Sequence, residues 1–343
     1  MLKPINHSFY PKVLLLLVNT GSPSSPTKKA IKDFLLPFLS DRRVIQLHPL
    51  LWQIILRLFI LPRRPSRLVD LYKSIWLSNN YHDRNSSPLL YYTESVAKTI
   101  SIKYDDRVIT KACFLYSKPT LQEVIAKAYK EYLPRSIIVL PLFPQLSAVT
   151  HGAVADSLSK SINKLQIIPT TTIINGYYDN QHYLKAISNT INNYWKLHSK
   201  PEHLIFSWHG IPLKYFEKGD AYYCFCVKTT REIAKLLSLD ESEYSYSFQS
   251  RFGLQKWLQP YTIENLSSQS KKHKSIDIIS PGFATDCLET MYELVKEVPK
   301  EALRNSDVQY RYIPCLNTSK EGIDCYSKIL EPYVSTFLKN NDA

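Results

Sequence analysis

The sequence predicts an α/β protein with two domains, each a doubly wound parallel sheet flanked by helices. Short runs of Val, Leu and Ile, typical of strands buried on both faces, alternate along the chain with segments of helical spacing. The alternation starts again in the second half, as expected for parallel strands joined by helices. The 343 residues, of which 44% are hydrophobic, suffice for two such cores.

The first half begins with a predicted strand at residues 13–19, which ends in the turn sequence Asn-Thr-Gly-Ser-Pro. A helix is expected at 28–39, and a strongly apolar segment, 50–61, ends at Pro62. By the same periodicities, further helices are expected at 96–104, 121–132 and 153–165, and strands at 108–116, 136–142 and 166–174.

The second half shows the same alternation. Strands are predicted at 244–249 and 308–314 and in runs that end at residues 207 and 280, and helices at 183–197, 226–237, 288–298 and 326–340. We therefore divide the chain into a first domain at 10–174, which includes the apolar segment 50–62, and a second at 175–325. The last helix is expected to pack back on the first domain.

The composition narrows the choice of partners. A net charge of +13 suits nucleic acid, an anionic membrane surface or an acidic small molecule. The sequence has no zinc-finger spacing, RNP-type strand or concentrated basic helix, which argues against nucleic acid. Six cysteines are too few for a disulfide scaffold in a chain of this length. Residues 1–12 lack the apolar core of a signal peptide, so the cytoplasm is the expected location.

Two segments, 206–212 and 281–289, carry the residues best suited to catalysis. Each follows a predicted strand and turns at a Gly beside a Pro. Ligands bind at the carboxyl ends of strands in such sheets, where one segment presents His209 and the other Glu289. This pair suits proton abstraction, metal handling or both. The motifs G-x-G-x-x-G, G-x-x-x-x-G-K-[ST] and G-x-S-x-G are missing, so dinucleotide, NTP and serine-hydrolase sites lose their main support.

Short motifs spread over nearly the whole chain resemble, in order, those of ferrochelatase, the family that inserts ferrous iron into a porphyrin. They are Leu-Val-Asn-Thr-Gly-Ser-Pro (17–23) and the segments 38–44, 140–147, 206–212, 219–222, 248–253, 257–262, 281–290 and 312–317. The resemblance implies two Rossmann-like, chelatase-type domains with the active-site cleft between them. It also implies a lyase of haem biosynthesis that acts on Fe²⁺ and protoporphyrin IX or a related porphyrin. Iron is then a substrate, and no permanently bound cofactor is expected.

The resemblance makes His209 and Glu289 the catalytic residues, on opposite sides of the porphyrin. Imidazole accepts a proton near pH 7 and also binds Fe²⁺. The sequence therefore leaves open whether His209 acts as a base, as a metal ligand or as both. Glu293 and Glu297 follow at i+4 and i+8 and share one helix face with Glu289. They form either a solvated acidic face or, as we favour, a carboxylate ladder that passes the metal inward, lined up by the π-type distortion that this helix has in the family. The expected metal contacts are thus His209, Glu289, Glu293 and Glu297.

Porphyrin contacts are implied at Arg63, Arg64, Ser87, Tyr116, Phe143, Ser250, Trp257, Phe283 and Asp286. The aromatic residues Phe143, Trp257 and Phe283 would press the macrocycle out of plane, with core packing as the alternative. Arg63 and Arg64 would bind propionates, or would merely cap a helix C-terminus. Asp286 would orient His209 or cap the start of its helix.

Several residues depart from the family pattern and put the fine porphyrin contacts in doubt. Leu115 stands where many relatives have Arg, and Ser86 stands where Gly usually precedes Ser-Pro. Leu146, Val149 and His151 alter a segment that is usually rich in hydroxyl groups. His151 is expected at the surface, with a metal contact as the alternative.

Other functions stay open from the sequence. A related chelatase would act on another tetrapyrrole or metal, such as coproporphyrin or cobalt, because ligands alone rarely reveal the choice of metal. A non-catalytic porphyrin or haem carrier would need the pocket but not both His209 and Glu289. No cysteine follows Cys325, so an iron–sulfur cluster is not expected. A monomer is expected, with a homodimer as the alternative.

The apolar segment 50–61 is too short to span a bilayer, which takes about 20 residues. It forms either a buried core helix or a lip over the pocket that dips into the membrane interface. In the second case Trp52 would lie at headgroup level, and Arg57, Arg63 and Arg64 would meet anionic lipid. The lip predicts peripheral contact with the inner membrane.

Overall fold

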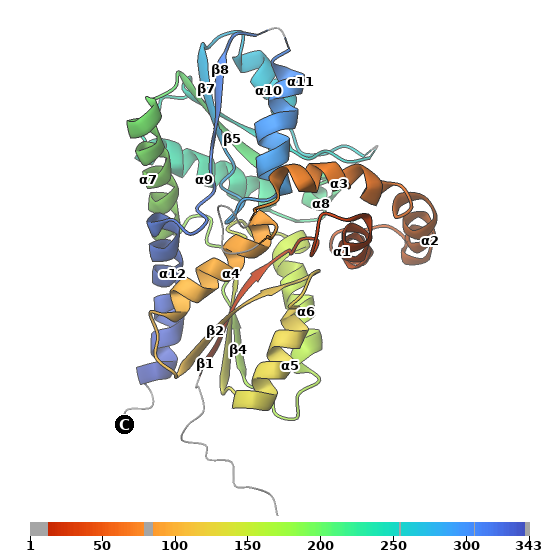
Figure 1. The fold of residues 1–343 in the computed structure, drawn as a ribbon. Helices are drawn as coiled ribbons and strands as arrows, with labels where there is room; N and C mark the ends of the chain where they lie inside the picture. The colour runs from red at the N-terminus through yellow and green to blue at the C-terminus, as the bar shows by residue number, and fades with distance from the viewer. Residues whose placement is uncertain (1–12, 79–84, 254, 305, 340–343) are drawn as a thin grey trace, which may run out of the picture.

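The computed structural model describes residues 13–78, 85–253, 255–304 and 306–339, so residues 10–12 and 340 of the predicted elements lie outside it. The described residues form two lobes (Figure 1), each with a four-stranded parallel sheet. The order in the first sheet is β2 (Val108–Phe114), β1 (Val13–Asn19), β3 (Ser136–Pro141) and β4 (Thr170–Ile173). The order in the second is β6 (Tyr244–Gln249), β5 (His203–His209), β7 (Ser275–Ile279) and β8 (Gln309–Ile313). The predicted α/β architecture is confirmed.

The central strands are buried on both faces, which explains their unbroken apolar sequences. All seven residues of β1 are buried. Leu15 and Leu17 pack with the helices on one face of the sheet, and Leu14 and Leu16 pack with those on the other. A strand covered in this way has no polar face, so its sequence does not alternate. β4 is shorter than predicted because Ile167 and Ile168 are exposed and lie before the sheet.

The longer helices of the described residues are α1 (Lys28–Ser40), α3 (Arg64–Ile75), α4 (Pro88–Ser101), α5 (Leu121–Tyr132), α6 (Ala153–Ile162), α7 (Gln181–His198), α9 (Tyr222–Leu236), α10 (Thr262–Gln269) and α12 (Lys320–Lys339). Short helices are α8 (Leu213–Glu217) and α11 (Val298–Ala302). Neither α3 nor α10 was expected from the sequence, and α4 begins earlier than predicted because Ser87 caps it and Pro88 occupies its first turn. α12 contacts α4 and β3 of the first lobe as well as α7.

The apolar segment 50–61 is not a buried core helix. It forms α2 (Pro49–Ile55) and the π-helical turn η2 (Leu56–Ile60), with Trp52 and Leu56 packed inward. Leu50 is 73% exposed, and Leu51, Ile54, Leu58 and Phe59 are each more than half exposed. The alternative of a buried helix is therefore wrong. None of the helices in the described ranges is long and apolar enough to cross a membrane.

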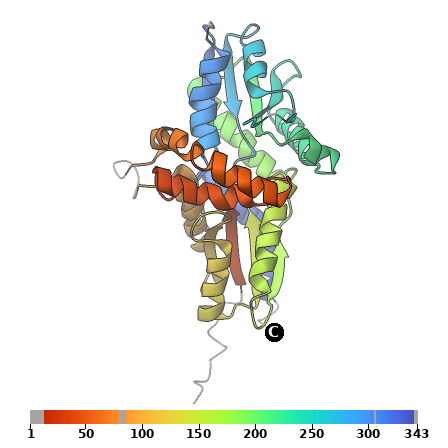
Figure 2. The ribbon, with the colours of Figure 1, turned by 90° about the vertical axis from the view of Figure 1, so that its right-hand side faces the viewer.

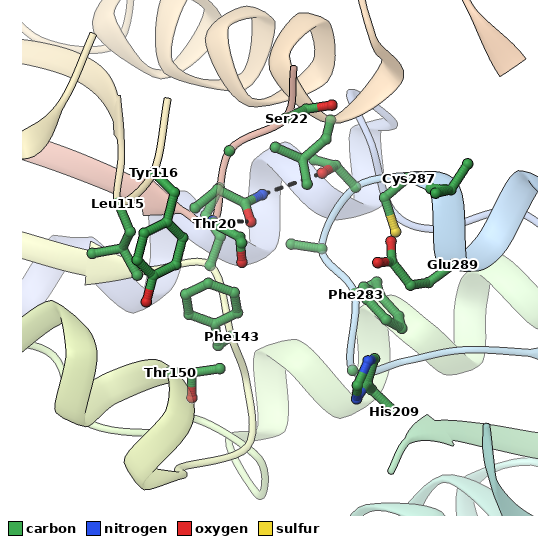
Figure 3. Close-up of a pocket in the computed structure, with 18 of the residues that line it drawn as sticks. Thr20, Ser22, Leu115, Tyr116, Phe143, Thr150, His209, Phe283, Cys287 and Glu289 are labelled. Carbon is green, nitrogen blue, oxygen red and sulfur yellow. Dashed lines mark hydrogen bonds between the residues drawn. The ribbon is translucent and has the colours of Figure 1, made fainter. Parts of the chain in front are cut away.

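The two lobes meet at the carboxyl ends of their strands. Thr20 and Ser22 follow β1, His209 ends β5, and their side chains lie around one space (Figure 3). The helices α1 to α3 lie beside this junction in both ribbon views (Figures 1 and 2). The fold therefore gathers residues that are distant in sequence at one place.

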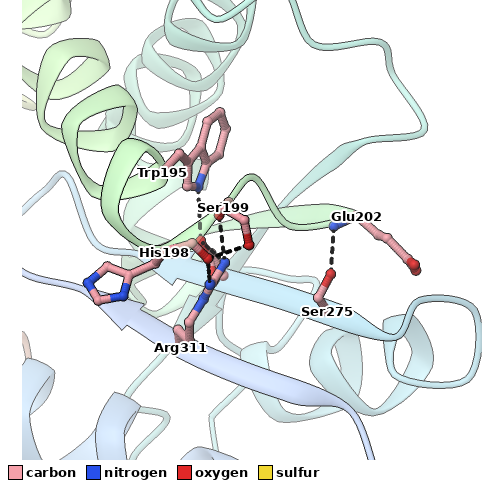
Figure 4. Close-up of polar contacts among 7 residues, drawn as sticks. Trp195, His198, Ser199, Glu202, Ser275 and Arg311 are labelled. Carbon is pink, nitrogen blue, oxygen red and sulfur yellow. Dashed lines mark hydrogen bonds and ion pairs between the residues drawn. The ribbon is translucent and has the colours of Figure 1, made fainter.

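A buried ion pair joins α7 to the second sheet. Asp277 of β7 is fully buried, and Arg311 of β8 donates to its carboxylate at 2.7 and 3.1 Å. Trp195 Nε1 donates to the same carboxylate at 2.9 Å. Arg311 also donates to the backbone carbonyls of His198 and Ser199 at the end of α7 (Figure 4). One guanidinium therefore both balances a buried charge and donates to the carbonyls at a helix C-terminus. These additional hydrogen bonds offset the cost of removing the ion pair from water.

Candidate active site

Two joined cavities lie between the lobes. The inner cavity, of about 170 Å³, is lined by the ends of β1, β3 and β5, by α1, α3 and α4, and by the segment 282–289. The outer cavity, of about 830 Å³, is lined by α2, α3, the segment 248–257 and the helix that follows Leu288. His209 and Glu289 line both cavities, so they stand where the two meet.

The contacts of His209 determine which ring nitrogen carries a proton. Its Nδ1 lies 2.6 Å from the carbonyl oxygen of Gly210. A carbonyl can only accept, so Nδ1 carries a proton, and in the neutral form of the ring the lone pair belongs to Nε2. Gly210 is required there because a Cβ atom would lie 2.9 Å from the carbonyl oxygen of Gln249. Phe283 faces the imidazole with 6.3 Å between the ring centroids.

Glu289 begins a π-helical segment, η4 (Glu289–Glu297), whose start is tied to the end of β6. Gln249 Nε2 donates to the backbone carbonyl of Glu289 at 2.8 Å. The i→i+5 hydrogen bonds of a π-helix widen each turn, so residues four apart come into line. Glu289, Glu293 and Glu297 accordingly all line the outer cavity.

Glu293 is held more firmly than its neighbours. The backbone N–H and the hydroxyl of Ser250 donate to its two carboxylate oxygens at 2.7 and 2.5 Å. Burial raises the pKa of Glu293 to about 7; the hydrogen bonds from Ser250 oppose this shift and repulsion from Glu289 adds to it. Burial, with repulsion from Glu301, also raises the pKa of Glu297. In the part of the chain that the structure describes, no three His, Cys, Asp or Glu side chains are grouped to hold a metal ion.

The predicted aromatic walls divide between the cavities. Phe143 and Phe283 line the inner cavity (Figure 3), and Trp257 lines the outer one, with its Nε1 donating to the Phe252 carbonyl at 2.9 Å. Tyr116 also lines the inner cavity and donates its hydroxyl hydrogen to Asp41 at 2.8 Å. The phenol therefore has a partner in the protein already.

The two arginines after the apolar segment have different surroundings. Arg63 Nη1 donates to the carbonyl of Phe59 at 3.4 Å and therefore caps η2. Arg64 begins α3, lines the outer cavity and lies 4.5 Å from the ring centre of Phe252. Ser87, the N-cap of α4, accepts from Leu90 N–H and lines the inner cavity. Arg63 thus makes the helix cap that was the alternative to propionate binding for both arginines.

Asp286 and His151 have contacts that differ from the expected ones. Asp286 accepts from Tyr312 and Thr290 at one oxygen and from Asn317 at the other. These contacts tie the start of η4 to β8 and to the segment after it. His151 is not at the surface but 6% exposed, because η3 (Ala148–Gly152) turns it inward beside Phe143. Burial lowers its pKa to about 4, so the ring is neutral.

Other residues of the site were not found from the sequence. Tyr72 of α3 and Cys287 line the inner cavity, and Lys214 and Arg251 line the outer one. Burial, together with the nearby Glu289, raises the pKa of Tyr72 well above its usual value, so its phenol stays protonated. Arg64 and Tyr72 are eight residues apart, about two helical turns. This spacing could have indicated a shared helix face, but only if α3 had been predicted as a helix.

Comparison with known proteins agrees with this geometry. The family model for ferrochelatase matches residues 12–333. Two ferrochelatases, from Francisella tularensis subsp. holarctica (strain OSU18) and subsp. novicida (strain U112), are each 41% identical, over 327 and 326 residues. Both matches cover 94% of this chain and 96% of the relative.

Solved structures of other chelatases share the fold. The sirohydrochlorin chelatase SirB of Bacillus subtilis subspecies spizizenii, in complex with cobalt, superposes with a TM-score of 0.53 at 11% identity, over 96% of this chain and 97% of that chain. Such low identity shows the fold alone, whereas the sequence matches to ferrochelatases extend over nearly the whole chain. The chain therefore belongs to the ferrochelatase family, the lyases that insert iron into a porphyrin in haem biosynthesis.

Proposed function

We propose that the porphyrin binds across both cavities, between His209 and Glu289, and that His209 accepts the pyrrole protons. The observation that carries this proposal is the hydrogen bond from His209 Nδ1 to the Gly210 carbonyl, which leaves the Nε2 lone pair free. Neutral imidazole with a free lone pair is suited to take a proton near neutral pH. If iron arrives from the opposite side, the imidazole is left to act as base.

We further propose that iron reaches the macrocycle along Glu297, Glu293 and Glu289. These carboxylates are four residues apart and line the outer cavity. A single carboxylate can replace a water ligand of a hydrated cation and release the cation again, because it does not enclose it. In this proposal iron is the substrate, and it passes along the carboxylates without being retained.

The charges around the two cavities favour a porphyrin whose carboxylates lie on one edge. The lysine and arginine residues of the pocket, Arg64, Lys214 and Arg251, all line the outer cavity. No described Lys or Arg lines the inner cavity, where Phe143, Leu115 and the carboxylate of Glu289 lie. Burying a propionate there without a partner would cost several kcal/mol. Protoporphyrin, with apolar groups on the edge away from its propionates, fits better than coproporphyrin.

The segment 50–61 supports peripheral membrane contact. Its five exposed apolar residues lie beside the outer cavity, which Trp52, Arg64 and Leu68 help to line. Exposed apolar side chains followed by arginines are typical of a surface that enters the headgroup region of an anionic membrane.

Replacing His209 tests the proposed base. His209→Ala is expected to lower turnover of Fe²⁺ and porphyrin by about 10²- to 10⁴-fold, because a general base is lost. Porphyrin affinity, followed by fluorescence quenching, and the unfolding midpoint should stay near the wild-type values. Turnover above roughly a tenth of wild type would exclude His209 as the base.

Glu293 gives the iron route a pH signature. A carboxyl with a raised pKa is charged only above that pKa, so the iron concentration needed for half-maximal rate should fall as the pH rises through about 7. Glu293→Gln should require more iron and lose this pH dependence. Asp70→Asn, at an exposed position on α3, is the matched control and should leave the profile unchanged. An unaltered profile in Glu293→Gln would contradict the route.

Leu115 tests the preference for one carboxylate edge. Leu115→Arg places a guanidinium in the inner cavity and is expected to raise the ratio of coproporphyrin to protoporphyrin turnover by about tenfold, since one buried carboxylate gains a partner. Leu115→Met has similar volume and no charge, and should leave the ratio unchanged. Equal ratios in all three proteins would contradict the proposed orientation.

Membrane contact is tested with vesicles of anionic lipid. The wild type should bind them at low salt and be released by salt, and Leu51→Asp with Phe59→Asp should abolish binding without unfolding the protein. The matched control is Ile167→Asp with Ile168→Asp, which alters two exposed isoleucines at the far end of the first lobe. Equal binding by the two double variants would show that residues 50–61 are not the contact surface.

A further inference from the structure

The turn that carries Phe283 is held by a tyrosine that does not line either cavity. Tyr183, on α7, is 1% exposed, and its hydroxyl donates to the carbonyl oxygen of Pro281 at 2.8 Å. Pro281 begins the turn 281–283, and the Phe283 N–H donates to the Ser280 carbonyl at 3.2 Å. The hydroxyl of Tyr183 therefore contacts the turn just before the ring that faces His209.

The same hydroxyl receives a hydrogen bond from the first lobe. Gln145 follows β3, is 2% exposed and lines the inner cavity. Its Nε2 lies 3.4 Å from the Tyr183 hydroxyl and 3.1 Å from the Thr229 hydroxyl. Tyr183 gives its only hydroxyl hydrogen to Pro281, and Thr229 gives its own to the carbonyl of Tyr178 or Phe225. Both hydroxyls must therefore accept a hydrogen bond from the Gln145 side chain. This requirement places the NH₂ group of the amide, and not its oxygen, toward them.

This orientation brings the remaining amide atom against the turn. Gln145 Oε1 is buried without a hydrogen-bond partner among the described residues. A Cβ atom on Gly282 would lie 3.6 Å from it and 3.3 Å from the indole ring of Trp208. The space beside Gly282 is therefore about the size of a methyl group and is bounded by both side chains. The hydrogen bond from Tyr183 to Pro281 opposes movement of the turn into this space.

We propose that Tyr183 is a positioning residue that sets the separation between Phe283 and His209, and thereby how strongly the bound porphyrin is bent out of plane. The inference rests on the proposed binding of the porphyrin between His209 and Glu289, with the ring of Phe283 against the macrocycle. A wall can distort a macrocycle only if it resists being pushed back. The hydroxyl supplies that resistance by linking α7, the first lobe and the turn through one oxygen atom.

Tyr183→Phe removes this oxygen and keeps the ring. It is expected to lower kcat about tenfold, the loss typical of one buried hydrogen bond, with a change in the porphyrin KM of less than about twofold. The out-of-plane bands in the resonance Raman spectrum of the bound metal-free porphyrin should weaken in parallel. This spectroscopic signature separates positioning from a general loss of stability.

Tyr177→Phe is the matched control. Tyr177 is equally buried and lies edge-on to Tyr183 with 5.5 Å between the ring centroids, but its hydroxyl has no hydrogen-bond partner among the described residues. This variant should match the wild type in kcat and in the Raman bands. Should Tyr183→Phe not fold, Gln145→Leu takes its place. It removes the donor to Tyr183 and should weaken the bands in the same direction.

The outcomes separate this inference from the proposed function. If porphyrin bound to the wild type shows no out-of-plane bands, the proposed contact with Phe283 fails and the inference fails with it. If the wild type shows the bands and Tyr183→Phe keeps them at full intensity, only the inference is overturned. Equal losses of kcat in Tyr183→Phe and Tyr177→Phe, in step with equal losses of thermal stability, would assign Tyr183 a structural role alone.

Discussion

The site depends on the parallel arrangement of both sheets. Parallel strands need helices on both faces, and each crossover returns the chain to the same edge, so all strand carboxyl ends of a lobe open in one direction. The order β2-β1-β3-β4 in one lobe and β6-β5-β7-β8 in the other is equivalent, and the two sets of carboxyl ends face each other. The cleft is therefore a consequence of the topology, and the loops supply its chemistry.

Hydrogen bonds between the lobes keep the cleft walls in register. Ser147 Oγ and the Ala148 N–H donate to Asp220 at 2.8 and 2.9 Å. Asn19, at the end of β1, donates to Thr285 of the second lobe at 3.3 Å. The bond from Asn19 to Thr285 is buried and the two bonds to Asp220 are partly buried, and hydrogen bonds become stronger and costlier to break as water is excluded. A site split between two lobes can in this way have fixed dimensions, which pressing on a flat macrocycle requires.

Local sequence was sufficient for most of the architecture. The apolar run of β1 is only seven residues long and lies before a turn signal, and this short length favours a buried strand over a buried helix. His209 and Glu289 were also accessible, because His209 ends one buried strand, Glu289 lies in the segment after another, and strand ends are where such sheets bind ligands. The family followed from ordered motifs and is confirmed by the matches over nearly the whole chain.

The sequence by itself therefore determined the features that depend on neighbours along the chain. These are the strands, the turns after them and the residues that those turns present. The tertiary structure decided what depends on distant partners. The apolar sequence of the segment 50–61 is compatible with either a buried or an exposed helix. The tertiary structure decides between them, because Trp52 and Leu56 pack inward and the apolar residues of the other face are exposed to solvent. His151 is buried because η3 turns it toward Phe143. Tyr183 reaches Pro281 across 98 residues of sequence, a contact that no local pattern encodes.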